Sequence, residues 1–114
     1  MKTKHIIHFG QSQNMSQIED KSVDLIVTSP PYPMIEMWDD IMAGQNSSIK
    51  DAFSENKPSV AFELMHKELD KVWNECNRVM KDGAILCINI GDATRTINGS
   101  FALYNNHSRI VSYC

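Results

Sequence analysis

The sequence is poor in glycine and in long apolar runs, and each shortage excludes a class of protein. Its 114 residues include only five glycines, which stand far apart, so the glycine-rich loop of a nucleotide-binding fold is missing. No apolar run approaches the roughly 18 residues that suggest a transmembrane helix, and the N-terminus lacks the hydrophobic core of a signal peptide. The sequence therefore indicates neither membrane insertion nor export.

Cysteine is also scarce, and its three positions form no recognisable motif. Cys76, Cys87 and Cys114 are odd in number and include no C-x-x-C pair, so neither a disulfide framework nor a zinc site is indicated. Cys76 and Cys87 fall on apolar faces, which predicts inert, buried thiols. His5 and His8 are typical of a surface or an edge strand. We therefore expect no metal and a reducing, cytoplasmic location.

Positive charge is in deficit, with 11 basic against 14 acidic residues and a net charge of −3. The molecule as a whole has no field that would attract nucleic acid. The basic residues at the two ends are an exception, because residues 93–114 contain no acid. A polyanion would meet these ends first. Candidate contacts to DNA phosphate are therefore Arg95, His107 and Arg109, although a solvated helix start explains the last two equally well.

What is present is an ordinary globular composition, 42% hydrophobic and 22% charged, which excludes a disordered or fibrous protein. The length is that of one domain. It falls well short of the roughly 200 to 300 residues that we expect of an enzyme with both a cofactor site and a macromolecular substrate.

The strongest strand signal lies at Val23–Thr28, a β-branched and almost continuously apolar segment. Such a run is typical of a central parallel strand with both faces covered. His5–Phe9, stopped by Gly10, predicts a weaker strand, and residues 11–20 predict a short helix or a loop.

Three prolines follow the strong strand at Ser29-Pro30-Pro31-Tyr32-Pro33, and they predict a stiff, extended loop. Residues 34–58 are irregular in pattern and predict a long, partly mobile loop of the functional kind. Within it, Trp38 is a candidate either for a ligand pocket or for a simple lid anchor.

A long amphipathic helix is predicted after a cap at Ser59, because apolar residues recur at spacings of three and four from residue 62 to residue 79. Lys81-Asp82-Gly83 predicts its end, and residues 84–90 predict a second buried strand. Residues 94–100 then predict a loop, and residues 101–114 the first turns of a helix. Strand, helix and strand together predict a right-handed β-α-β unit of an α/β fold.

Ligands of such sheets lie beyond the carboxyl ends of the strands, which here are Ser29–Tyr32 and Asn89–Asp92. The hydroxyl of Ser29 and the carbonyl of Pro30, which the next proline fixes, can accept hydrogen bonds from both N–H groups of the exocyclic amine of a nucleobase. These two hydrogen bonds make the lone pair of the amine available. The ring of Tyr32 can stack on the nucleobase, which must first leave its duplex. Asp92 can bond within such a pocket or cap the next turn.

The segment from Val23 to Tyr32 resembles the catalytic signature of the DNA amino-methyltransferases, which transfer a methyl group from S-adenosylmethionine to N4 of cytosine or N6 of adenine. Further segments resemble the N4-cytosine branch of this family, namely Phe9-Gly10, Ile35–Asp39, Ile88–Asp92, Phe101–Tyr104 and Asn106–Ile110. The resemblance implies that Ser29 and Pro30 hold the amine, that Tyr32 stacks on the flipped base, and that the methyl group passes by in-line displacement. It also implies a base pocket and a cofactor contact. The pocket residues would be Thr28, Pro31, Trp38 and Asp92, and the cofactor residues Gly10 and Gln11, where the family usually has Gly-Asp.

The beta class of this family is permuted, with the catalytic loop first and the glycine-rich cofactor loop last. By this resemblance, residues 1–114 form a single incomplete catalytic domain with a partial Rossmann-like, S-adenosylmethionine-dependent methyltransferase fold and parallel central strands. The cofactor loop and the target-recognition region would belong to a missing C-terminal half or a second chain. Double-stranded DNA is the expected partner, within a restriction-modification system. Serine at the first signature position favours cytosine. The alternatives are N6-adenine methylation and a non-catalytic fragment that needs a partner chain.

Overall fold

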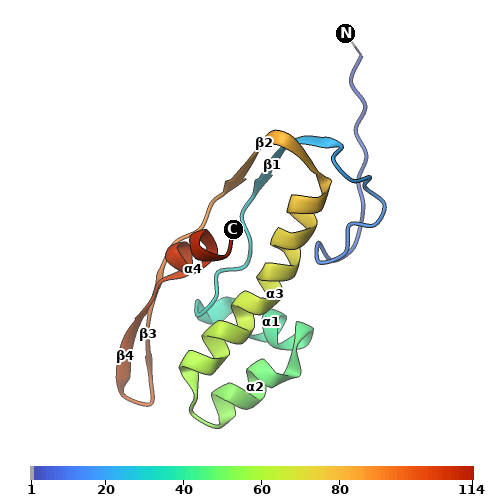
Figure 1. Cartoon of the computed structure of the whole chain (residues 1–114). Helices are drawn as coiled ribbons and strands as arrows, with labels where there is room; N and C mark the ends of the chain where they lie inside the picture. The colour runs from blue at the N-terminus through green and yellow to red at the C-terminus, as the bar shows by residue number, and fades with distance from the viewer. Residues whose placement is uncertain (1) are drawn as a thin grey trace.

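The fold is an elongated arrangement of helices and two small sheets, seen in a computed structural model that describes residues 2–114. Its principal extents are 57 × 24 × 21 Å. Figure 1 shows residues 2–9 leaving the body as an extended trace, while α1 and α2 pack beneath α3. The elements are β1 (Val23–Thr28), the 3-10 helix η1 (Glu36–Trp38), α1 (Asp39–Gln45), α2 (Ser47–Ser54), α3 (Pro58–Val79), β2 (Met80–Ile88), β3 (Ala93–Ile97), β4 (Ser100–Tyr104) and α4 (Asn106–Tyr113).

The predicted β-α-β unit is confirmed. β1 and β2 pair in parallel, with Leu25 opposite Ile85 and Thr28 opposite Ile88, and α3 connects them. Within the described residues the pair forms a sheet of two strands, so both of its outer edges are unpaired. Parallel pairing requires a crossover connection, which α3 provides, and the carboxyl ends of both strands lie at the same end of the sheet.

The crossover helix α3 buries the face that its apolar spacing predicts. Its buried residues include Met65, Leu69, Trp73, Cys76 and Val79. The helix begins at Pro58 rather than behind a Ser59 cap, because proline suits the first helical position, where its missing N–H would have no partner.

The predicted helix end at Lys81-Asp82-Gly83 is wrong, because α3 ends at Val79 and these residues lie in β2. The last carbonyls of the helix accept hydrogen bonds from the backbone N–H groups of Lys21 and Ser22, which end it early. The pairing register then shifts between Val23 and Leu25, and Gly83 adopts a φ of 80° in this irregular stretch.

The prediction of a long mobile loop over residues 34–58 is wrong, since η1, α1 and α2 occupy much of it. Met42 and Ile49 are fully buried and Ala52 nearly so, and all three belong to a core built around α3. Asn46 caps α2 by accepting the N–H of Ser48 at 3.0 Å. The apolar residues of two short helices are too few to show a clear period in sequence.

The predicted loop at residues 94–100 is also wrong, because β3 and β4 form an antiparallel hairpin there. Asn98 and Gly99 make its turn, with φ values of 50° and 80°. An Asn-Gly pair between strands is the strongest short-range signal for such a turn. The predicted C-terminal helix is confirmed, though only from Asn106.

The predicted strand at His5–Phe9 is wrong, because this segment is extended without pairing and Phe9 is 95% exposed. Several predictions of burial are also wrong. The strand predicted at residues 84–90 is not buried, since Ile85 is 61% exposed. Val27 of β1 is 73% exposed, so the strand is covered on one face only. Cys87 is exposed, whereas Cys76 is buried as predicted. In each case no described segment covers the side chain.

Among residues 2–114, no helix is long and apolar enough to cross a membrane.

Candidate functional site

The two strand ends lie side by side, as the sequence predicts. The carbonyl of Thr28 accepts the backbone N–H of Asn89 at 2.9 Å, which carries the pairing of β1 and β2 one residue past the end of β2. Beyond this bond the chain enters the proline loop, where Ser29 is exposed and Pro30 is buried. The serine hydroxyl is thus accessible, while the following residue anchors its backbone.

The proline loop ends in a tight turn over Tyr32–Ile35. The N–H of Ile35 donates to the carbonyl of Tyr32 at 3.1 Å, Pro33 takes the second position, and Met34 at the third has a φ of 70°. These are the features of a type II turn, whose third position usually holds glycine or asparagine. A methionine in this region is strained. Its side chain is only 1% exposed, so core packing holds it there.

The ring of Tyr32 lies against the loop that follows β2. Its Cε2 atom would lie 3.6 Å from a Cβ atom added at Gly91, which is ordinary van der Waals contact. The aromatic ring of one predicted strand end therefore lies close to Gly91 at the other, with room for no more than a Cβ atom between them. Ser29, Pro30, Tyr32 and Gly91 are brought together by the pairing of the two strands.

A buried asparagine ties both loops to the crossover helix. The Nδ2 of Asn106 donates to the carbonyl of Pro33 at 3.0 Å and to the carbonyl of Gly91 at 3.1 Å. Its Oδ1 lies 2.8 Å from Nε2 of His66 on α3. Both side chains are fully buried. The sequence interpretation did not single out either residue.

Asp92 caps a helix in the structure. Its Oδ1 accepts the backbone N–H of His107 at 3.0 Å, beside the Asn105 cap that bonds the N–H of Ser108. This is the capping alternative that the sequence left open. A carboxylate near a helix N-terminus is favoured by the dipole of the helix.

Arg95 of β3 is held by a carboxylate of this chain. Its guanidinium forms two hydrogen bonds to Asp39, at 2.9 and 2.7 Å, and it stacks over Phe53. The hydrogen bonds to Asp39 raise the pKa of Arg95 further above its usual value. The pair joins the hairpin to α1, next to the part-buried Trp38. Pairing of this kind competes with any contact between Arg95 and phosphate.

Arg109 is likewise occupied. It bonds Glu63 and Asp70 of α3, with shortest distances of 2.8 Å to each, and these bonds hold the pKa of Glu63 below its usual range. His107 is exposed. Of the three predicted phosphate contacts, only His107 has a side chain without a carboxylate partner among the described residues, and the phosphate role of all three stays a prediction.

Comparison with known proteins identifies the family. Residues 23–112 match the DNA methylase family of N6- and N4-acting enzymes, which is most of the chain and includes the whole proline loop. The chain belongs to the DNA methylase family. This confirms the resemblance that the sequence indicates.

Two curated relatives match this DNA methylase chain over nearly its full length. One is the "Type II methyltransferase M.MthZI" of Methanothermobacter thermautotrophicus, 46% identical over 99% of this chain and 32% of its own. The other is the "Type II methyltransferase M.MjaI" of Methanocaldococcus jannaschii, 48% identical over 96% of this chain and 40% of its own. The chain thus spans about a third to two fifths of these relatives. No solved structure matches it significantly.

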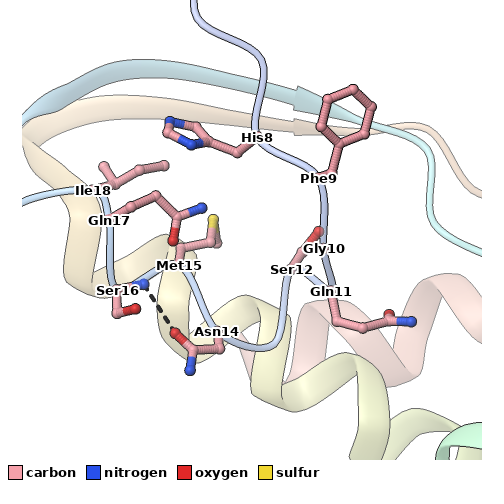
Figure 2. A pocket seen from close by; sticks show the side chains of 10 residues that line it. All are labelled: His8, Phe9, Gly10, Gln11, Ser12, Asn14, Met15, Ser16, Gln17 and Ile18. Carbon is pink, nitrogen blue, oxygen red and sulfur yellow. Dashed lines mark hydrogen bonds between the residues drawn. The ribbon is translucent and has the colours of Figure 1, made fainter.

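The residues predicted to face the cofactor of this DNA methylase, Gly10 and Gln11, line an open hollow of about 400 Å³ with other residues of the segment 8–18. Figure 2 shows the Phe9 ring and the Gln11 side chain pointing away from Met15. Gln11 contacts Gln45 at 3.4 Å. Because every lining residue comes from one segment and residues 2–11 are all exposed, these residues do not by themselves form an enclosed site for S-adenosylmethionine.

Among residues 2–114, no group of three or more His, Cys, Asp or Glu side chains is placed to hold a metal ion.

The positions that sequence interpretation missed in this DNA methylase share one feature: each acts through a buried polar contact with a distant segment. His66 stands on the apolar face of a helix, and its bond to Asn106 spans 40 residues. The only local signal is that His66 follows Met65 on the buried face, where a polar residue requires a partner.

Proposed function

We propose that this chain is the catalytic part of a site-specific DNA methyltransferase that modifies N4 of cytosine. The observation that carries the proposal is the proline loop at the end of β1, with an exposed Ser29 beside an anchored Pro30 and with Tyr32 close to Gly91. The family membership and the relatives' names support methylation of DNA. The word "Type II" in those names supports a role in restriction and modification.

In the proposed mechanism the chain prepares the amine of a flipped base. The lone pair of an exocyclic amine is delocalised into the base ring, so the amine is a poor nucleophile. Ser29 Oγ and the Pro30 carbonyl would each accept one of its N–H bonds, and this pair of acceptors favours a tetrahedral nitrogen with a localised lone pair. Tyr32 would hold the base by stacking, a contact worth about 1 to 3 kcal/mol per base. S-adenosylmethionine would supply an electrophilic methyl group.

The decisive substitutions are Ser29→Ala and Tyr32→Ala in the methylating enzyme. Ser29→Ala should lower the rate of methyl transfer by about 10²-fold, because an oriented polar contact at the reacting group is lost. Tyr32→Ala should also lower the rate, because the stacking contact with the base is lost. The controls are Ser59→Ala and Tyr113→Ala, which remove a hydroxyl group and an aromatic ring from residues outside the site. If methyl transfer survives both site changes at near-normal rate, the mechanism is wrong.

One measurement distinguishes cytosine from adenine as the methylated base. Methylated DNA digested to nucleosides and analysed by mass spectrometry should contain N4-methylcytosine, because serine rather than aspartate or asparagine stands at the first signature position. Detection of N6-methyladenine alone would replace cytosine with adenine in the proposal.

We further propose that β1 and β2 belong to a larger Rossmann-like sheet, completed by a polypeptide that carries the cofactor loop and the DNA reader. The unpaired edges of the two-stranded sheet, the open hollow at Gly10 and Gln11, and the greater length of the relatives support this. Residues 1–114 alone should then bind neither S-adenosylmethionine nor double-stranded DNA tightly. Calorimetry showing tight cofactor binding by this chain alone would overturn the proposal.

A further inference from the structure

The Tyr32–Ile35 turn is held in its conformation by a hydrogen bond from one buried side chain. Type I and type II turns differ in the orientation of their central peptide, which here joins Pro33 to Met34. The carbonyl of that peptide accepts the Nδ2 of Asn106 at 3.0 Å. Pro33 is among the most buried side chains of the protein, so this oxygen lies where water is a poor substitute for the asparagine.

The hydrogen-bonding capacity of Asn106 leaves no ambiguity about its orientation. Its amide has two N–H donors and one carbonyl acceptor, and the two nearby backbone carbonyls, of Pro33 and Gly91, can only accept. The amide oxygen must therefore face His66, and His66 must donate from Nε2 across the 2.8 Å contact. The Nδ1 atom of His66 is buried and has no partner among the described residues.

The surroundings of His66 favour the neutral form of its ring. Burial lowers the pKa of His66 below its usual 6.5, against the opposing effect of the Asn106 hydrogen bond. The charged groups that face it are Glu63 and Asp70 of α3 and Arg109 of α4. The two carboxylates act to raise the pKa of His66, but Arg109, which bonds both of them, acts to lower it, and burial is the largest of these effects.

We infer that Asn106, oriented by His66, is a positioning residue that fixes the Tyr32–Ile35 turn in its type II form and so sets the direction of the catalytic Tyr32. The inference rests on the proposed function for its catalytic meaning. The same amide bonds the carbonyl of Gly91, and the Tyr32 ring lies close to this residue. One side chain thus fixes both the turn that carries the ring and the backbone of the glycine beside the ring.

The informative substitution is Asn106→Asp, because it keeps the shape and removes both donors. The carboxylate would face two backbone carbonyls, which it cannot bond. The hydrogen bond to the Pro33 carbonyl, which helps to hold Met34 at its strained φ, would then be lost. The matched control is Asn105→Asp at the neighbouring position, where the side chain only accepts, from the N–H of Ser108, and an aspartate caps equally well.

Hydrogen exchange of the folded chain measures the effect. Asn106→Asp should speed exchange of the Ile35 amide by about tenfold or more, as expected when a buried hydrogen bond is lost. The amides of α2 should change by less than about twofold, and Asn105→Asp should leave Ile35 unchanged. Unchanged exchange at Ile35 in folded Asn106→Asp would overturn the inference.

A second measurement needs no variant and therefore does not depend on whether Asn106→Asp folds. Long-range ¹H–¹⁵N correlation on the unmodified chain at neutral pH should show His66 protonated on Nε2 and not on Nδ1. An Nδ1-protonated or charged ring would overturn the inference.

In the methylating enzyme, Asn106→Asp should lower kcat by about tenfold while KM for DNA stays within about threefold, since positioning acts on the reacting geometry more than on DNA binding. Equal loss in Asn105→Asp would contradict this. If the unmodified enzyme transfers no methyl group to DNA, the proposed function is overturned instead, and the hydrogen-exchange and tautomer results remain valid tests of the turn.

Discussion

The two regions to which the sequence assigns chemistry differ in how they are built. The proline loop is bound to α3, to α4 and to the end of β2 by core packing at Met34 and by hydrogen bonds through Asn106. The segment around Gly10 and Gln11 is exposed, and Gln11 and Gln13 bond α1 through glutamine side chains only. The amine-holding side of the proposed reaction is thus preorganised within this chain, whereas the cofactor side is not.

This difference shows that the two halves of a bisubstrate site need not be stabilised by the same part of the fold. Buried polar groups need hydrogen-bond partners, and in the loop region the amide of Asn106 finds all of its partners in three distant segments, at Pro33, Gly91 and His66. The predictions below test the contrast between the anchored region and the exposed one.

The largest effect is expected at Met65, which is fully buried in the core that supports the loop. Met65→Ala should lower the free energy of unfolding by about 2 to 5 kcal/mol because it leaves a cavity. Ile7→Ala, in the exposed segment, should change it by no more than about 0.5 kcal/mol. Urea unfolding of the two variants measures both, and a similar loss in each would contradict the contrast.

A smaller effect is expected at the ion pair of Arg95 and Asp39, which are 17% and 21% exposed. Arg95→Met should lower the free energy of unfolding by about 1 to 3 kcal/mol, because Asp39 loses a two-bond, charge-assisted contact. Lys21 and Asp82 form the matched pair outside this region, at 67% and 95% exposure, and Lys21→Met should have no measurable effect. Urea unfolding is again the measurement, and an unaffected Arg95→Met would count against the anchoring of α1.

Acid should weaken the loop region through His66. Because burial lowers the pKa of His66 in the folded chain, the unfolded chain binds a proton first as the pH falls below about 6.5, and the free energy of unfolding falls with it. Carboxylates with lowered pKa values, such as Glu63, act only below their usual 4.5. Urea unfolding at about pH 7.5 and pH 5.5 should therefore show a loss that His66→Gln reduces. His107→Gln, at an exposed histidine, should not reduce it.

The smallest effects are expected at two glycines. Gly99→Ala should cost about 1 kcal/mol because its φ of 80° suits glycine. Gly44→Ala should instead stabilise by roughly 0.5 to 1 kcal/mol, since Gly44 lies in α1 with open space around it. Thermal unfolding distinguishes the two signs, and destabilisation by both changes would contradict the assignment of α1.

Sequence reasoning predicted the elements whose signals are local and repeated. β1 has a β-branched run, α3 has six apolar residues at helical spacing, and the proline loop has residues that permit few other conformations. Their arrangement follows from the rule that parallel strands need a crossover. The position of the candidate loop beside Gly91 was predictable for the same reason.

The wrong predictions concern mainly segments whose secondary structure depends on tertiary contacts. α1 and α2 are too short to be stable alone and depend on burying Met42 and Ile49. The hairpin was predictable from Asn98-Gly99, a signal that the interpretation did not use. The contact of Asn106 with His66 could not be predicted, because nothing in the sequence indicates which buried polar groups meet.

The two open edges of the β1–β2 sheet bear on how the protein behaves at high concentration. A strand edge with free N–H and C=O groups, next to exposed side chains such as Leu25, Val27 and Ile85, is a template for pairing with another chain. Pairing between copies would compete with the addition of further strands that we propose. Under that proposal the yield of active enzyme should depend on the order and rate at which its parts meet, and dilute conditions or simultaneous synthesis of the parts should favour assembly over precipitation.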